Sequence, residues 1–250
     1  MAEFILATSG LTKEFRGFSA VNGVDLTVRR GTIHALIGPN GAGKTTVFNL
    51  LTKFLEPTSG RIVFNGRDIT DERPAAVARL GMVRSFQISA VFPHLTVLAN
   101  VRLALQRPLG TSFQFWRSKK SLDRLNGEAD RLLADVGLAT YRDLVASELP
   151  YGRKRALEFA TTLALRPELM LLDEPMSGLG SEDVGRISGL IRRAAQDRTV
   201  LMVEHNLSVV ADLSDTITVL TRGRILAEGS YAAVSANQEV REAYLGTGHA

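Results

Sequence analysis

The sequence has no cysteine among its 250 residues, which excludes disulfide bonds and cysteine-ligated metal sites. Such a composition is typical of a reducing compartment. No apolar run approaches the ~18 residues that a membrane-spanning helix requires. Residues 1–4 lack the basic segment that opens a signal peptide. We therefore expect a cytoplasmic protein that reaches a membrane only through its partners.

Neither sign of charge dominates, and aromatic residues are scarce. The 30 Lys and Arg residues against 26 Asp and Glu residues give a net charge of +4, and aromatic residues make up 6%. No basic stripe with interleaved aromatics is present, so we expect no nucleic-acid partner. Hydrophobic residues at 45% and charged residues at 22% are ordinary for a globular protein. No internal repeat divides the chain, and we treat residues 1–250 as one domain.

The stretch Gly38–Thr45 matches the phosphate-binding pattern G-x-x-x-x-G-K-[ST]. An apolar segment of strand length, residues 33–37, precedes it, and a helical pattern over residues 46–51 follows it. Glycines at such a strand–helix junction let backbone N–H groups converge on phosphate oxygens. Lys44 would reach the β- and γ-phosphates, and the Thr45 hydroxyl would hold Mg²⁺. The alternative, a glycine turn without a ligand, leaves the complete motif unexplained.

A second candidate site follows the apolar run at residues 169–172, which reads as a strand buried on both faces. Asp173 closes this run, in the position from which a carboxylate holds Mg²⁺ directly or through water. Glu174 comes next and is placed to act as the general base for a water attacking the γ-phosphate. The alternative for Glu174 is an acidic residue at a helix N-terminus.

Two further polar residues stand at strand ends. His205 follows a second apolar run, residues 199–203, and Gln87 ends the strand-like segment at residues 82–87. Parallel strands end at one edge of a sheet, where ligands bind, so we predict that His205 contacts the γ-phosphate. Gln87 could orient water or touch Mg²⁺. The alternatives are a structural histidine and a surface glutamine.

The remaining pattern predicts a P-loop α/β core interrupted by a helical insertion at about residues 88–165. A helix-period stripe at Leu122, Leu125, Ala129, Leu132, Leu133 and Val136 lies in that insertion. Elsewhere we expect strands and turns at residues 3–33, including one strand at 24–28, a strand with a hairpin turn at 61–66, a short helix at 74–80, strands at 217–220 and 225–227, and a helical tail at 231–245.

These motifs, in this order, resemble those of an ATP-binding cassette (ABC) ATPase, over nearly the whole chain. The matching segments are Phe15 for the adenine-stacking aromatic, Gly38–Thr46 for Walker A, Gln87 for the Q-loop, Leu149–Arg153 for the signature, Leu169–Glu174 for Walker B, Met176–Gly180 for the D-loop and His205 for the switch histidine. The resemblance implies a RecA-like core, an N-terminal antiparallel β subdomain and a helical subdomain that carries the signature.

The resemblance also implies ATP and Mg²⁺ as ligands. It assigns nucleotide contacts to Phe15, Val21, Gly38, Pro39, Asn40, Gly41, Ala42, Gly43, Lys44, Thr45, Thr46, Tyr151 and Gly152. It assigns Mg²⁺ to Thr45, Gln87 and Asp173, and catalysis to Glu174, His205 and Gln87.

A finer resemblance points to the ATPases of bacterial branched-chain (hydrophobic) amino acid importers. It rests on Phe86-Gln87, the segment 91–97, the Leu-x-Tyr-Gly form of the signature and the ending Ala243–Gly246. It implies a second ATPase subunit, in a heterodimer or homodimer, two membrane permease subunits and, indirectly, a periplasmic binding protein. The chain would then lie on the inner face of the cell membrane.

Several other functions remain open at this point. An importer of urea or short amides, a soluble ABC ATPase, and a P-loop GTPase or small-molecule kinase all share the phosphate-binding loop. A GTPase requires an Asn-Lys-x-Asp motif, which is absent. We also expect the aromatic residues Phe86, Phe92, Phe113, Phe115 and Trp116 to receive a permease helix, with packing inside the helical subdomain as the alternative.

The signature departs from the usual Leu-Ser-Gly-Gly-Gln of the family. Pro150 replaces a serine and has no N–H to donate, and Tyr151 replaces a glycine. In the D-loop, Gly180 stands where an aspartate is usual. We therefore expect the signature side of this chain to form a weak half-site in a head-to-tail dimer.

Overall fold

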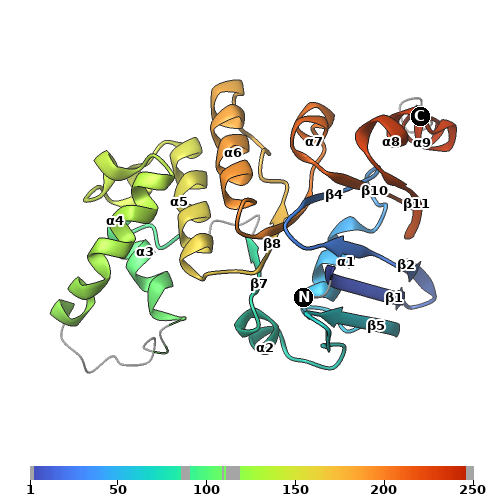
Figure 1. Ribbon diagram of the computed structural model, residues 1–250, viewed down its shortest axis with the longest axis horizontal. Helices are drawn as coiled ribbons and strands as arrows, with labels where there is room; N and C mark the ends of the chain where they lie inside the picture. Colours follow the sequence, from blue (N-terminus) through green and yellow to red (C-terminus); the bar gives the residue numbers. More distant parts are fainter. Residues whose placement is uncertain (1–2, 86–90, 109, 111–118, 246–250) are drawn as a thin grey trace.

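The computed structural model describes residues 3–85, 91–108, 110 and 119–245. Two sheets lie next to each other, and a group of helices lies beyond them at one end of the molecule (Figure 1). The predicted Q-loop residue Gln87 and the aromatic residues Phe86, Phe113, Phe115 and Trp116 lie outside the described residues.

An antiparallel sheet is built from the N-terminal part of the chain, as the sequence predicts. Its strands are β1 (Phe4–Phe15), β2 (Phe18–Val24), β3 (Thr27–Arg29), β5 (Ser59–Phe64) and β6 (Arg67–Asp68). The single strand predicted over residues 24–28 is wrong, since β2 and β3 are separate. The hydroxyl of Thr8, in β1, donates to the Val24 carbonyl and accepts from the Leu26 N–H, both at 2.8 Å. The regular backbone pairing with β1 is interrupted at this point, between β2 and β3.

A six-stranded sheet forms the centre of the molecule. Its strands, in spatial order, are β11 (Arg224–Gly229), β10 (Thr216–Thr221), β4 (Ile33–Ile37), β9 (Thr199–Val203), β8 (Leu169–Asp173) and β7 (Met82–Ser85). All neighbouring pairs are parallel except β10 and β11. Every residue of β4, β8 and β9 is buried, which confirms the prediction of a sheet covered on both faces.

Helices cover this sheet and extend beyond it. They are α1 (Lys44–Leu51), α2 (Pro74–Arg79), α3 (Val97–Gln106), α4 (Asn126–Asp135), α5 (Tyr151–Ala164), α6 (Ser181–Ala194), α7 (Leu207–Leu213), α8 (Tyr231–Ala236) and α9 (Gln238–Leu245). Among the described residues, 3₁₀ helices lie at Lys119–Leu125, Ala139–Tyr141 and Ala146–Glu148. The helix α3 packs against α4 and α5 away from the strands (Figure 1). Within the described ranges, no helix is both long and apolar enough to span a bilayer.

Two helical predictions are corrected in detail. The stripe from Leu122 begins in a 3₁₀ turn and becomes α-helical only at Asn126. The predicted helical tail is two helices, α8 and α9, because Asn237 adopts an extended backbone between them. The Asn237 side chain then accepts hydrogen bonds from the backbone N–H groups of Glu239 (2.9 Å) and Val240 (3.3 Å), which starts α9 anew.

Alternate residues of the buried strands face two separate cores. In β8, Leu169 and Leu171 pack with α1 and the antiparallel sheet, whereas Met170 and Leu172 pack with helices including α5, α6 and α7. This two-sided burial fixes the strand register, since a one-residue slip would exchange the two faces. The register therefore determines which residues reach the end of each strand.

One ionisable residue lies inside this sheet. His34 in β4 is buried, and its Nε2 atom is 2.7 Å from the Thr218 hydroxyl, which donates to Glu228 at 2.7 Å. Because the hydroxyl proton is given to Glu228, the hydroxyl oxygen accepts from His34 Nε2–H. Burial lowers the pKa of His34 from 6.5 to about 4.

We predict that His34 makes the protein sensitive to mild acid. Between pH 6.5 and pH 4 the unfolded chain protonates this histidine and the folded chain does not, so the free energy of unfolding falls as pH is lowered. The loss from pH 7 to pH 5 is about 2 kcal/mol at about 1.4 kcal/mol per pH unit. Urea unfolding of His34→Gln should lack this increment. His94→Gln, at an exposed position, is the control, and an equal pH dependence in all three proteins would contradict the prediction.

Candidate functional site

The loop between β4 and α1 is shaped by close backbone approaches. A Cβ atom on Gly38 would lie 2.1 Å from the Leu220 carbonyl oxygen, and one on Gly43 would lie 2.5 Å from that of Ala20. Only glycine fits at these two positions. In the described part of the chain, no side chain caps the N-terminus of α1. Its first N–H groups, with the helix dipole behind them, therefore suit a phosphate group.

Lys44, the first residue of α1, folds back over this loop. Its amine donates to the carbonyl oxygens of Gly38 (2.7 Å) and Pro39 (3.0 Å). Burial lowers the pKa of Lys44, and the nearby charges of Glu174 and Asp173 act in the opposite direction. The loop thus places a cation facing two carboxylates. Thr45, the next residue, is exposed and its hydroxyl is an oxygen ligand of the kind that Mg²⁺ prefers.

Asp173 ends β8 and is buried beside an arginine that sequence reasoning did not identify. The Arg84 guanidinium, from β7, donates through Nη2 to Asp173 Oδ2 and through Nη1 to Asn49 Oδ1 at 2.5 Å. Asn49 belongs to α1, so three elements meet at this arginine. The sequence signal for this residue was the placement of a charged side chain, Arg84, directly after the apolar Met82 and Val83 of a predicted strand.

Glu174 and His205, which the sequence places after neighbouring strands, are in direct contact. His205 Nε2 is 2.7 Å from Glu174 Oε1. The backbone of Glu174 has φ of 49°, the left-handed region, and its N–H donates to the Val203 carbonyl at 2.9 Å. A non-glycine residue in this region costs about 1–3 kcal/mol and is typical of functional sites.

Glu204, between β9 and His205, was also missed by sequence reasoning. Its buried carboxylate accepts from the N–H groups of Met176 (2.9 Å), His205 (2.8 Å) and Asn206 (3.0 Å). It therefore ties the segment after Glu174 to the segment that carries His205. A glutamate immediately after a fully apolar strand was the available signal.

The signature residues lie at the start of α5, with Pro150 as the N-cap. Tyr151 is half-exposed, and its hydroxyl donates to the Ser177 carbonyl at 3.3 Å and accepts from Arg155 at 2.9 Å. The next residue, Gly152, is buried, and a Cβ atom there would lie 2.1 Å from the Asp183 carboxylate. The signature is thus joined to the predicted D-loop within the chain.

Phe15 and Val21, two of the predicted nucleotide contacts, are placed differently. Phe15 ends β1 and is 42% exposed, with the Lys13 amine 5.3 Å from its ring centre. Its ring offers a flat surface on the hairpin whose Ala20 lies against the phosphate-binding loop. Val21 is fully buried in the core beneath the hairpin. A nucleotide contact at Val21 stays a prediction, and it would have to use the backbone because the side chain has no exposed surface.

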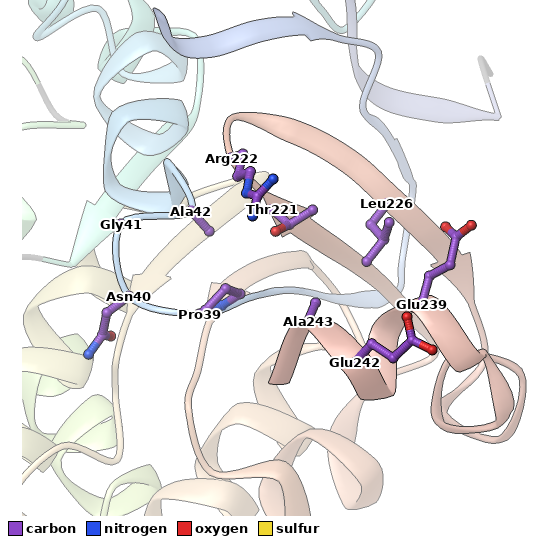
Figure 2. A pocket seen from close by; sticks show the side chains of 10 residues that line it. All are labelled: Pro39, Asn40, Gly41, Ala42, Thr221, Arg222, Leu226, Glu239, Glu242 and Ala243. Atoms are coloured by element: carbon purple, nitrogen blue, oxygen red, sulfur yellow. The ribbon is translucent and has the colours of Figure 1, made fainter. Parts of the chain in front are cut away.

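A pocket of about 420 Å³ borders the outer side of the loop (Figure 2). Pro39, Asn40, Arg222, Glu239 and Glu242 are among the residues that line it. Neither Lys44 nor the two carboxylates after β8 line this pocket. It therefore lies beside the phosphate site, and its far wall is the C-terminal helix α9.

Together, the glycine loop, the lysine at a helix start and the carboxylates at the ends of parallel strands define a P-loop nucleoside triphosphatase. This class follows from geometry in which β4, β8 and β9 deliver their polar ends to one edge of the sheet.

Comparisons with known proteins identify the family. Residues 21–177 match the family model described as ABC transporter, and residues 224–250 match that of the branched-chain amino acid ATP-binding cassette transporter. The chain is 39% identical to the high-affinity branched-chain amino acid transport ATP-binding protein BraF of Pseudomonas aeruginosa, covering 98% of this chain and 99% of the relative. It is 38% identical to LivG of Escherichia coli, a protein of the same description, with the same coverage.

A solved structure agrees with these relatives. The ADP conformation of MJ1267, an ATP-binding cassette of an ABC transporter, superposes with a TM-score of 0.85 at 30% identity, covering 98% of this chain and 100% of that one. The chain therefore belongs to the ABC transporter family and is an ATPase of that family. The fold class expected from the resemblance is confirmed.

We predict that Glu174→Gln lowers ATP turnover by about 10²–10⁴-fold, because the amide keeps the volume of the side chain but accepts no proton. Binding of a fluorescent ATP analogue should persist. Glu128→Gln is the control, since Glu128 pairs with Arg166 at 2.8 Å on α4, outside the site. Normal turnover in the Glu174 variant would remove this residue from the chemistry.

Proposed function

We propose that this chain is the ATP-hydrolysing, energy-coupling subunit of an importer for branched-chain or other hydrophobic amino acids. The observation that carries the proposal is the near full-length identity of 38–39% to transport ATP-binding proteins described for these substrates. The separate match of residues 224–250 to the branched-chain model supports it. An importer of urea or short amides is the alternative that the test must exclude.

The nucleotide in this proposal is ATP, held over α1. The loop Gly38–Thr46 would hold the phosphates through its backbone, Lys44 would neutralise their charge, and Phe15 would stack on the adenine. Mg²⁺ would be held by Thr45 and Asp173, with Gln87 as a third ligand, and would polarise the phosphate oxygens. The oxygen atoms of Thr45 and Asp173 suit this cation.

The chemistry would take place at the Glu174–His205 pair. Glu174 would accept a proton from the attacking water, and the contact of its Oε1 with His205 Nε2 would hold the carboxylate in place during that transfer. His205, 44% exposed in its side chain, would also reach the γ-phosphate. Glu204 would maintain this arrangement through its backbone contacts to both segments.

The permease would dock in a groove between the sheet and the helices. Two cavities, of about 220 and 150 Å³, share Val83, Arg84 and Leu165 in their lining. The exposed Phe54 lines the larger cavity, and Glu158 of α5 lines the smaller one. We propose that a permease helix fills this groove, which places the chain peripherally at the inner face of the membrane. The binding protein would act only through the permease.

The partner ATPase would complete each ATP site from across a head-to-tail dimer. Pro150 caps α5 without an N–H, and the Tyr151 hydroxyl is engaged by Ser177 and Arg155. The site built on this chain's Lys44 and Glu174, and completed by an ordinary signature, would be the stronger one. We therefore propose a heterodimer rather than a homodimer.

The substrate is tested by transport. We expect the chain, assembled in proteoliposomes with the permease and ATPase subunits of its own gene neighbourhood, to accumulate radiolabelled leucine or isoleucine in the presence of the binding protein. Urea and short amides should give no accumulation. Uptake of urea with no uptake of leucine would replace the proposed substrate class, and Lys44→Ala complexes supply the background without ATP use.

The asymmetry of the dimer gives a separate prediction. The isolated chain should bind ATP, dimerise poorly and turn over slowly, and the partner ATPase with the permease should raise its rate. Loss of one transition-state donor costs about 2.7–4 kcal/mol in other enzymes. Glu174→Gln should therefore reduce transport more than the matching change in the partner. Equal reductions, or full activity of this chain alone, would contradict the model.

A further inference from the structure

Arg84 is a buried cation that the catalytic roles above leave unexplained. Its side chain is 10% exposed and paired with Asp173, whose side chain is 2% exposed. Its second terminal nitrogen donates to Asn49 at 2.5 Å, and its guanidinium carbon lies 5.7 Å from the centre of the Phe48 ring. One side chain therefore connects β7 and the end of β8 with two residues of α1.

Stability alone is a poor explanation for this pair. Taking a guanidinium and a carboxylate out of water carries a desolvation cost that their attraction often fails to exceed. Burial of this pair carries a further cost, because the buried Arg84 Nε atom has no hydrogen-bond partner within the described residues. A well-packed apolar side chain in β7 would avoid that cost. The arrangement is therefore better explained by what it does to Asp173.

The pairing leaves Asp173 with a defined orientation. Arg84 engages Oδ2, and Arg84 is itself held by Asn49 from the helix that carries Lys44 and Thr45. The position of the Asp173 carboxylate is therefore fixed relative to α1, the helix that also carries the phosphate-binding residues. Groups that orient metal-binding side chains commonly contribute about 10–100-fold to metal affinity or activity.

We infer that Arg84 is a positioning residue that holds Oδ2 of Asp173, so that the other carboxylate oxygen serves the Mg²⁺ of the ATP site. The inference rests on the proposed Mg²⁺ site. Without the contact from Arg84 Nη2, the Asp173 carboxylate can turn away from the ATP site, and its Mg²⁺ affinity falls. Binding of the nucleotide in the absence of metal does not involve Asp173 and is maintained.

The test is the binding of a fluorescent ATP analogue to the purified chain, titrated with Mg²⁺ and repeated in EDTA, with Mn²⁺ binding followed by electron paramagnetic resonance. We compare Arg84→Met, which removes the charge, with Arg84→Lys, which keeps the charge but has one amine in place of the two terminal nitrogens. Asn49→Ala removes only the anchor on α1. The matched control is Arg102→Met, since Arg102 is also partly buried and pairs with Asp123 at 3.5 Å in the helical region.

In Arg84→Met, the metal concentration at half-saturation should rise by about 10–100-fold, with affinity in EDTA unchanged. Arg84→Lys and Asn49→Ala should give smaller shifts in the same direction, and Arg102→Met none. A purely structural role would lower thermal stability and weaken binding equally with and without metal. Either that result or an unchanged Mg²⁺ dependence overturns the inference. If Arg84→Met does not fold, the Lys and Asn49 variants decide it. A wild-type chain that shows no Mg²⁺ dependence would instead refute the proposed metal site.

Discussion

The alignment of parallel strands at one edge of the central sheet is the constraint on which the site depends. Leu36 of β4 pairs with Val203 of β9, and Val203 pairs with Asp173 of β8. The Gly38–Thr45 loop, the Asp173 carboxylate and the segment of His205 consequently emerge at one level. Burial on both faces of these strands maintains this register, because a slip of one residue would exchange the contents of the two cores.

Several locally unfavourable features occur at this edge. Glu174 has a left-handed backbone, Arg84 and Asp173 form a buried ion pair, and the Glu204 carboxylate is withdrawn from water. The Glu204 carboxylate is compensated by the hydrogen bonds that it accepts from three backbone N–H groups. The surrounding packed sheet makes these features tolerable, and they in turn fix the positions of the side chains at this edge.

The signature side has a different character. Tyr151 joins the start of α5 to the segment after Glu174 through Ser177. Two regions that face a partner chain in our proposed dimer are thus linked within this chain. The groove proposed for the permease has Arg84 in its lining, and Arg84 pairs with Asp173.

Local patterns predicted much of this molecule. The apolar runs at residues 33–37 and 199–203 are strands with those same bounds, and the motif at Gly38–Thr45 lies at the strand–helix junction that it requires. These features could be predicted because periodicity, glycine placement and apolar runs are properties of short stretches of neighbouring residues. The order of the motifs was likewise sufficient to predict the family, which the comparisons confirm.

Only the tertiary structure decided which side chains from distant parts of the sequence come into contact. The Arg84–Asp173 pair joins residues 89 positions apart, Glu204 reaches Met176 across 28, and the contact between Tyr151 and Ser177 spans 26. The burial of Val21 and the break at Asn237 were equally invisible in local pattern. The physical reason is that periodicity specifies the face on which a residue lies, whereas its partner depends on the register and packing of other elements.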